Sequence, residues 1–210
     1  MLSILQAAGW PIWPLVMCSI VALALILERY LFLRSKLIHP TKLLDEAISI
    51  SRPNLPANDV IKQMESSSVL GGVLASGLKA LLVQPRPNPE GLRSSMEVAG
   101  RHATQKLEKY LSALATIASV APLLGLLGTV IGMIEIFGSQ SGSGASGTNP
   151  AVLAHGISVA LYNTAFGLIV AIPCLIFWRF FRAKVDVLEL GLEQASERFY
   201  QHLKVHCRPE

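Results

Sequence analysis

Residues 111–137 read LSALATIASVAPLLGLLGTVIGMIEIF, and Glu135 is the one charged side chain among them. A helix needs about 20 predominantly apolar residues to cross the hydrocarbon core of a bilayer. This stretch therefore predicts a transmembrane helix. Glu135 is also the only residue between Tyr110 and Trp178 that is charged at neutral pH, so its role needs an explanation of its own.

Two further apolar stretches, residues 12–33 and 152–178, predict membrane spans. Charged residues make up 15% of the chain, against about 25% in a typical soluble domain. We expect an all-α membrane protein with three transmembrane helices, the first of them a retained anchor rather than a signal peptide. Aromatic residues typical of membrane interfaces lie near the ends of the spans: Trp10, Trp13, Tyr30, Tyr110 and Trp178.

The basic residues indicate the direction in which the chain crosses the membrane. All 18 of them lie between residues 29 and 109 or between residues 179 and 208. Cytoplasmic segments of membrane proteins carry the excess of Lys and Arg. We therefore expect residues 34–110 and 179–210 in the cytoplasm, and residues 1–11 and 138–151 on the outer side. The net charge of +4 reflects this topology and does not indicate a nucleic-acid partner.

Two of the predicted spans continue as helices into the cytoplasmic segments. Small and apolar residues recur every three or four positions from Leu92 to Glu135, which predicts one helix over residues 89–137. Such a helix is about 70 Å long at 1.5 Å per residue. The third span predicts a second long helix through residues 152–203.

The segment after the first span predicts shorter cytoplasmic helices. Residues 39–50 have helical spacing with Thr41 as a candidate N-cap, and residues 68–82 are apolar at helical spacing but too short to span. Proline and asparagine make residues 51–59 a breaker segment. Asn88 and Pro89 are the residue types preferred at an N-cap and at the first helical position.

Small residues form one face on each of the last two spans. In lipid, small residues let helix backbones approach closely. Two interpretations stay open: these faces pack helices together, or they line a channel filled by the helix of a partner. Pro122 and Pro173 lie inside the same spans, where each predicts a local kink. The residues of the two faces are Gly125, Gly128, Gly132, Ala160, Gly167 and Ala171.

Thr129 and Thr164 are hydroxyl residues on or beside these small faces. A threonine in a membrane helix commonly donates to the carbonyl one turn back, which satisfies it without any function. The alternative is a polar track for water or protons along both helices. Spacing alone leaves both interpretations open.

No pattern of a common catalytic site occurs in the chain, whether HExxH, P-loop, CxxC or nucleophile elbow. The five His and the three Cys are dispersed, which disfavours a metal site or a disulfide framework. We expect no enzyme activity, no catalytic residue, no metal and no cofactor. Three spans also give too little wall to enclose a path, so a channel requires further copies or another subunit.

Two segments resemble a known family: APLLGLLGTVIGMIEIF (121–137) and GISVALYNTAFGLIVAIP (156–173). They are similar to the paired signature segments of the MotA/TolQ/ExbB proton-channel family, most of all to its ExbB branch. The resemblance covers roughly residues 110–180, and the expected topology agrees along the whole chain. The cytoplasmic insert resembles the family only in type.

The resemblance implies an energy transducer in the inner membrane of Gram-negative bacteria, with a periplasmic N-terminus and a cytoplasmic C-terminus. Such subunits form a homo-oligomeric ring in the lipid, typically a pentamer, around the helices of an ExbD-like single-span partner. Proton flow then drives motion that a TonB-like protein transmits to outer-membrane receptors for iron–siderophore complexes or vitamin B12. A TolQ-like subunit for envelope integrity and a non-conducting scaffold are the alternatives.

In this family the titrating carboxylate belongs to the partner's helix, and the resemblance implies that Thr129 and Thr164 line the channel. One position departs from the pattern, because Val159 stands where family members carry a Glu. Glu135 continues the stripe of glycines toward the outer end of its span. It is either an interfacial acid that faces protein or a proton entrance.

Overall fold

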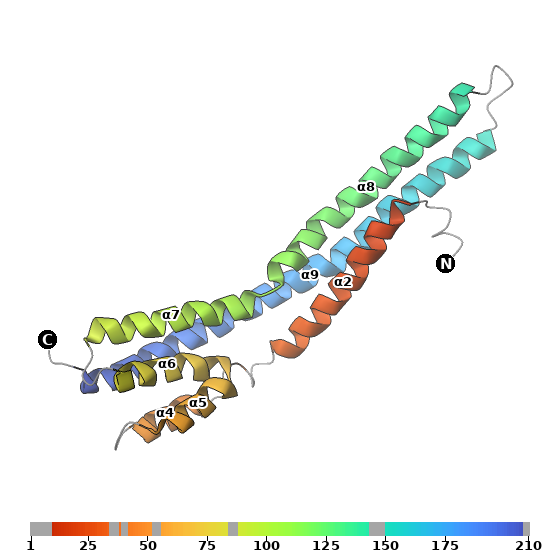
Figure 1. The fold of residues 1–210 in the computed structure, drawn as a ribbon. Helices are drawn as coiled ribbons and strands as arrows, with labels where there is room; N and C mark the ends of the chain where they lie inside the picture. Colours follow the sequence, from red (N-terminus) through yellow and green to blue (C-terminus); the bar gives the residue numbers. More distant parts are fainter. Residues whose placement is uncertain are drawn as a thin grey trace. The chain divides into compact units, whose positions relative to one another are not determined.

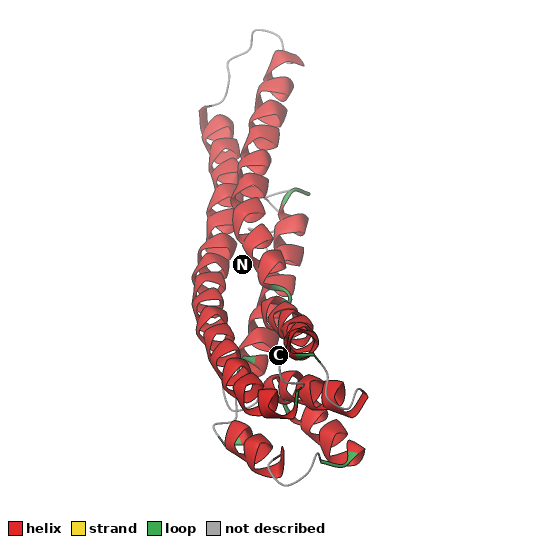
Figure 2. Cartoon of the chain, turned by 90° about the vertical axis from the view of Figure 1, so that its left-hand side faces the viewer, coloured by secondary structure: helices red, strands yellow, loops and turns green. Residues whose placement is uncertain are grey.

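The computed structural model describes residues 10–33, 38, 42–51, 56–83, 88–142 and 150–207. All regular structure within these ranges is helical (Figure 2), which confirms the predicted all-α class. The candidate N-cap Thr41, the segment before Trp10 and most of the predicted outer loop lie outside the described residues.

Three helical stretches are long and apolar enough to cross a membrane, as predicted. They run through α2 (Ile12–Phe32), through α8 (Leu111–Gly142) as far as Gly138, and through α9 (Pro150–Leu203) from Gly156 onward. The chain divides into two compact units. The helix α9 belongs to the first unit as far as Phe180 and to the second unit beyond it.

The first unit comprises residues 1–28 and 110–180 and contains the apolar parts of α2, α8 and α9 (Figure 1). Most of its buried residues in α8 and α9 are small; Ala121 is 0% and Ala160 is 2% exposed. Its large apolar side chains lie outside instead. A soluble monomer rarely exposes so much apolar surface, so this surface suits lipid. More than half exposed are Leu123, Leu126, Ile134, Leu161, Ile169 and Ile176.

The second unit comprises residues 29–109 and 181–210. It holds α4 (Leu43–Ser51), α5 (Asn58–Ser67), α6 (Val69–Val83), α7 (Pro89–Glu108), the end of α9 and the short 3-10 helix η1 (Lys204–His206). The helix α6 packs against both α5 and α7 (Figure 1). This unit has a core of large apolar side chains, as a water-soluble domain has. Fully buried are Leu70, Leu74, Leu78, Leu92, Phe181 and Phe199.

The predicted single helix over residues 89–137 is divided in two. The helix α7 ends at Glu108, Lys109 is extended with ψ 133°, and Tyr110 has a φ of 66°. A left-handed conformation costs a non-glycine residue about 1–2 kcal/mol. The helix α8 then starts at Leu111 and continues to Gly142, five residues beyond the predicted end. The prediction of an unbroken helix was therefore wrong at this one junction.

Arg29 binds the end of α7. Its side chain is 2% exposed, and its Nη1 donates to the carbonyl oxygens of Lys106 at 3.2 Å and Leu107 at 3.1 Å. The guanidinium also lies 4.8 Å from the ring centroid of Phe32. The last carbonyls of a helix lack intrahelical donors and form the negative end of its dipole. Arg29 therefore stabilises the C-terminus of α7.

The shorter helices of the second unit agree with the sequence in part. Asn88 Oδ1 accepts from the backbone N–H of Glu90 at 3.3 Å, and Pro89 is the first residue of α7, as predicted. The helix α6 matches the predicted range within one residue. The prediction missed α5, which begins at Asn58 inside the segment read as a breaker.

Candidate functional site

The candidate site is the contact between α8 and α9 in the first unit. A Cβ built on Gly125 would lie 2.8 Å from the carbonyl oxygen of Asn163, and one built on Gly167 would lie 2.6 Å from that of Ala121. Side-chain carbons do not approach backbone oxygens so closely, so both positions require glycine. At Gly132 the nearest atom would be the Cβ of Ala160, at 3.2 Å. Within this chain the two small faces pack against each other.

Asn163 is a polar residue inside this contact. Its side chain is 2% exposed, and a Cβ on Gly128 would lie 2.7 Å from its Cβ and 2.9 Å from its Cγ. Glycine at position 128 therefore makes room for the amide. The sequence marks Asn163 only as a polar residue in an apolar span, and it contains no signal that pairs it with Gly128.

The two threonines differ in what their hydroxyls bind. Thr129 Oγ1 donates to the carbonyl oxygen of Leu126 at 2.7 Å, one turn back in its own helix. Thr164 Oγ1 instead donates across the contact to the carbonyl oxygen of Gly125 at 3.2 Å. The two acceptor carbonyls, of Leu126 and Gly125, belong to consecutive residues of α8, about 1.5 Å apart along the helix axis. The two hydroxyls therefore lie at nearly the same depth.

Thr129 lies beside these glycines, one turn from Gly125 and Gly132, at the edge of the outer surface of α8. It lines a shallow, largely apolar hollow with Val130, Met133, Ile134 and Phe137. Both threonines are partly exposed in the single chain. Each hydroxyl oxygen retains lone pairs that can accept a further hydrogen bond.

Glu135 lies apart from the threonines. It is six residues beyond Thr129, about 9 Å further along α8, and its side chain is exposed. The contact face continues through Ile136 instead, since a Cβ built on Gly156 would lie 2.6 Å from Ile136 Cδ1. The stripe that ends in Glu135 in the sequence therefore does not bring this carboxylate into the contact with α9.

The other predicted positions lie around this contact. Both α8 and α9 continue as helices through Pro122 and Pro173. Ala171 is buried, whereas Val159 is partly exposed. Among the described residues no group of three or more His, Cys, Asp or Glu could hold a metal ion.

The arrangement provides hydroxyl and amide groups within a contact of small residues, but no titrating acid at the depth of the threonines. Hydroxyls can donate to a carboxylate and accept from a carboxylic acid. This part of the chain is therefore suited to offer hydrogen-bond partners to a proton carrier rather than to be one.

Comparison with known proteins assigns the family. Residues 65–194 match the model of the MotA/TolQ/ExbB proton channel family. A biopolymer transport protein named ExbB-like 3 from Synechocystis sp. is 30% identical over 206 residues, 98% of this chain and 96% of that protein. The biopolymer transport protein exbB1 of Vibrio cholerae is 31% identical over 81% of this chain and 74% of its own length. The Tol-Pal system protein TolQ of Pseudomonas aeruginosa is 36% identical over 59% of this chain and 54% of its own length.

The match covers the site described above as well as the helices on either side of it, from α6 to most of α9. It includes both threonines and the glycines of the α8–α9 contact. This chain belongs to the MotA/TolQ/ExbB proton channel family and is most similar to its ExbB members.

Proposed function

We propose that this chain is the ring-forming subunit of a proton-driven motor in the bacterial inner membrane. Together with an ExbD-like single-span subunit, it couples the proton-motive force to TonB-dependent uptake across the outer membrane. The N-terminus is periplasmic and the C-terminus cytoplasmic. The ring is a homo-oligomer, a pentamer by analogy with the family.

One observation carries this proposal. Two threonine hydroxyls lie at nearly the same depth along α8 and α9, and neither helix has an acidic residue at that depth. Thr164 donates to the carbonyl oxygen of Gly125, and Thr129 donates to that of the next residue, Leu126. A charged carboxylate at the centre of a bilayer costs at least about 2.5–3.5 kcal/mol, so a proton carrier needs polar partners. We assign the carrier to the partner's helix and the polar partners to Thr129 and Thr164.

The packing of α8 on α9 limits where the partner's helix can bind. The glycines of the contact are covered within one chain, so a guest helix meets other surfaces of α8 and α9. The hollow beside Thr129 is the surface that we propose for it. Glu135, exposed near the outer end of α8, then lies at the mouth of the path.

Proton flux through reconstituted complexes tests the proposal. The chain is purified with the single-span protein that carries an Asp in its span, and both are placed in vesicles with an internal pH-sensitive dye. We expect Thr129→Val and Thr164→Val to lower the flux at least tenfold while the complex still assembles. Thr164→Ser retains the hydroxyl and should restore most of the flux.

Thr116→Val is the matched control. Thr116 is also in α8, is exposed, and donates to the carbonyl oxygen of Ser112 at 2.8 Å. Its replacement should leave the flux unchanged. Normal flux in both valine variants at the proposed positions would remove them from the path, and a chain that purifies without any single-span partner would refute the motor function. Unchanged flux in Glu135→Gln would make Glu135 structural.

The TolQ branch is the second candidate, since the TolQ protein of Pseudomonas aeruginosa matches at 36% identity over 126 residues. The two branches differ in what the motor serves. Deletion of an ExbB-like subunit should abolish energised uptake of iron–siderophore complexes, whereas deletion of a TolQ-like subunit should make cells sensitive to detergent. A reconstituted complex that carries no proton flux at all would favour a scaffold.

A further inference from the structure

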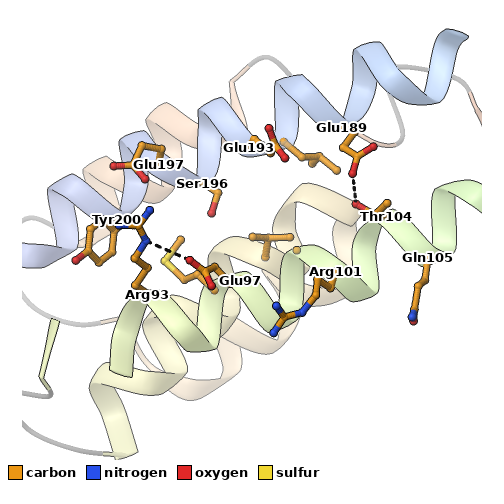
Figure 3. A pocket seen from close by; sticks show the side chains of 14 residues that line it. Arg93, Glu97, Arg101, Thr104, Gln105, Glu189, Glu193, Ser196, Glu197 and Tyr200 are labelled. Carbon is orange, nitrogen blue, oxygen red and sulfur yellow. Dashed lines mark hydrogen bonds and ion pairs between the residues drawn. The ribbon is translucent and has the colours of Figure 1, made fainter. Parts of the chain in front are cut away.

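A groove lies between α7 and the C-terminal part of α9 in the second unit (Figure 3). Its volume is about 610 Å³, within the range of about 300–1,000 Å³ that ligand sites occupy. Its apolar lining includes Val73 of α6, Met96 of α7 and Leu192 of α9. None of the residues that line it takes part in the candidate site between α8 and α9.

Gly100 lies in this groove without a packing reason within the chain. It is an interior residue of α7, where glycine weakens a helix relative to alanine. A Cβ built on it would meet nothing within 4 Å, unlike the glycines of the α8–α9 contact. The missing side chain therefore keeps the groove open, which suits a segment that approaches the backbone of α7 closely.

The wall formed by α9 is acidic. Glu189, Glu193 and Glu197 follow one another at four-residue intervals, so they form a row along one side of the helix. Like charges at this spacing destabilise a helix. Thr104 donates to Glu189 at 3.0 Å and Gln201 donates to Glu197 at 2.7 Å, but neither donor carries a charge. A cation in the groove would relieve the repulsion.

The wall formed by α7 does not neutralise this row. Arg93 is paired with Glu97 of its own helix at 3.2 Å, and its guanidinium carbon lies 6.0 Å from the ring centroid of Tyr200. Figure 3 shows Arg101 extending along α7 rather than across to the carboxylates. The groove therefore has four carboxylates and two guanidinium groups and is acidic overall.

We infer that this groove binds a Lys/Arg-rich segment of the single-span partner, next to its membrane span. The inference rests on the proposed function for the existence of that partner and on the proposed topology for the cytoplasmic position of the groove. The flank of a membrane protein that lies in the cytoplasm carries the excess of Lys and Arg, which is complementary to the row on α9. The anionic lipid headgroups of the inner leaflet are repelled by the same row.

A short flank of the partner would reach the groove. Along α9, Glu189 is 11 residues and Glu197 is 19 residues beyond Trp178, the predicted end of the span. At 1.5 Å per residue these positions are about 16 and 28 Å from that end. An extended chain covers about 3.3 Å per residue, so about five to nine residues beyond the partner's span suffice.

Cysteine protection tests the groove in the purified complex. The native Cys18, Cys174 and Cys207 are replaced by Ser, and Gly100→Cys provides a single thiol. We expect a maleimide to label this thiol at least tenfold more slowly in the complex with the partner than in the chain alone. Gly91→Cys is the control, because a Cβ at Gly91 also meets nothing within 4 Å and Gly91 is outside the groove. Its labelling should not change.

The contribution of the acidic row and the identity of the bound segment are tested in the same chain, which has Gly100→Cys as its single cysteine. Glu193→Arg should remove most of the protection, whereas Glu90→Arg, at an exposed position of α7 outside the groove, should not. A second cysteine placed five to nine residues beyond the partner's span should form a disulfide with Gly100→Cys on oxidation. Equal labelling with and without the partner would overturn the inference, and so would a disulfide only between two copies of this chain.

These outcomes are separable from the motor function. If the complex assembles and conducts protons but leaves Gly100→Cys unprotected, the inference about the groove is overturned and the proposed motor function is not. A chain that captures no single-span partner fails at the earlier step, in the flux experiment.

Discussion

The two units of this chain use opposite designs. In the first unit small residues are buried and large apolar residues are exposed, so that Gly125 packs on Asn163 while Leu126 is 55% exposed. In the second unit large apolar residues such as Leu74 are buried, and the described charged residues other than Arg29 are partly or fully exposed. Lipid removes the hydrophobic drive between helices, and close backbone approach takes its place. The two units of this chain therefore follow different packing rules.

Intrinsic fluorescence can follow the first unit alone, since all three tryptophans, Trp10, Trp13 and Trp178, belong to it. Pulse proteolysis or amide hydrogen exchange can follow the second unit. Each substitution below is therefore measured with both readouts on the detergent-purified chain.

The largest expected effect is that of Leu74→Ala. Leu74 is 0% exposed, and truncating a buried leucine in a water-soluble core costs about 2–5 kcal/mol. Pulse proteolysis in urea should show this loss for the second unit. Leu126→Ala removes the same atoms from the lipid-facing surface and should change the stability of the first unit by less than about 0.5 kcal/mol. Equal losses of stability from the two substitutions would contradict the difference in packing between the two units.

Arg29→Met comes next. It removes two hydrogen bonds from a charged donor to the last turns of α7, and hydrogen bonds to charged groups contribute about 1.5–3 kcal/mol. Amide exchange should become faster at the C-terminal end of α7. Arg29→Lys keeps the charge but not the forked geometry and should show a smaller effect. Exchange that stays at the wild-type rate in both variants would mean that α7 ends without help from Arg29.

Gly167→Val tests the close packing of the first unit. The added carbons would collide with the backbone at Ala121, and overpacking costs about 1–3 kcal/mol. Tryptophan fluorescence should report earlier unfolding. Gly138→Val, in α8 with no atom within 4 Å of the added Cβ, is the control and should unfold like the wild type. If both variants unfolded like the wild type, close packing at Gly167 would not contribute to the stability of the first unit.

The smallest effect concerns pH. Burial raises the pKa of the Cys207 thiol in the second unit above its ordinary value of 9.0, although Lys204 acts in the opposite direction. The raised pKa adds stability that is complete below pH 9 and is lost as the pH rises through the folded-state pKa. Between pH 9 and 11 the wild type should therefore lose slightly more stability than Cys207→Ala. An identical pH profile for the two proteins would contradict this.

The sequence predicted what depends on local composition and periodicity. The three spans follow from runs of apolar residues, and the start of α7 follows from Asn88 and Pro89. The break after α7 did not follow, because Tyr110 adopts a positive φ that glycine or asparagine would have signalled. The helical stripe continues in the sequence across this break, so periodicity alone could not reveal it.

The candidate site shows the same division. Residue types and spacing singled out the small faces and both threonines. They did not show which residues meet, because the register between α8 and α9 depends on packing in three dimensions. Thr164 was expected either to bond within its own helix or to line a path, and its bond to Gly125 crosses between helices. The sequence identified Arg29 only as one of the basic residues that indicate topology. Its burial against the end of α7 also depends on packing in three dimensions.

The continuity of α9 has a consequence for changes in chain length. A row of buried positions runs through both units at steps of three, four or seven residues, with the buried Val170 and Tyr200 beside it: Ala160, Asn163, Gly167, Ala171, Cys174, Phe181, Val185, Leu188, Leu192, Ala195, Phe199 and Leu203. One residue inserted near Phe180 would turn every later side chain by about 100° about the helix axis. A seven-residue insertion would leave a phase error of only about 20°. Insertions and deletions in α9 should therefore be tolerated in heptads, whereas the non-helical junction at Lys109 and Tyr110 can absorb a single residue.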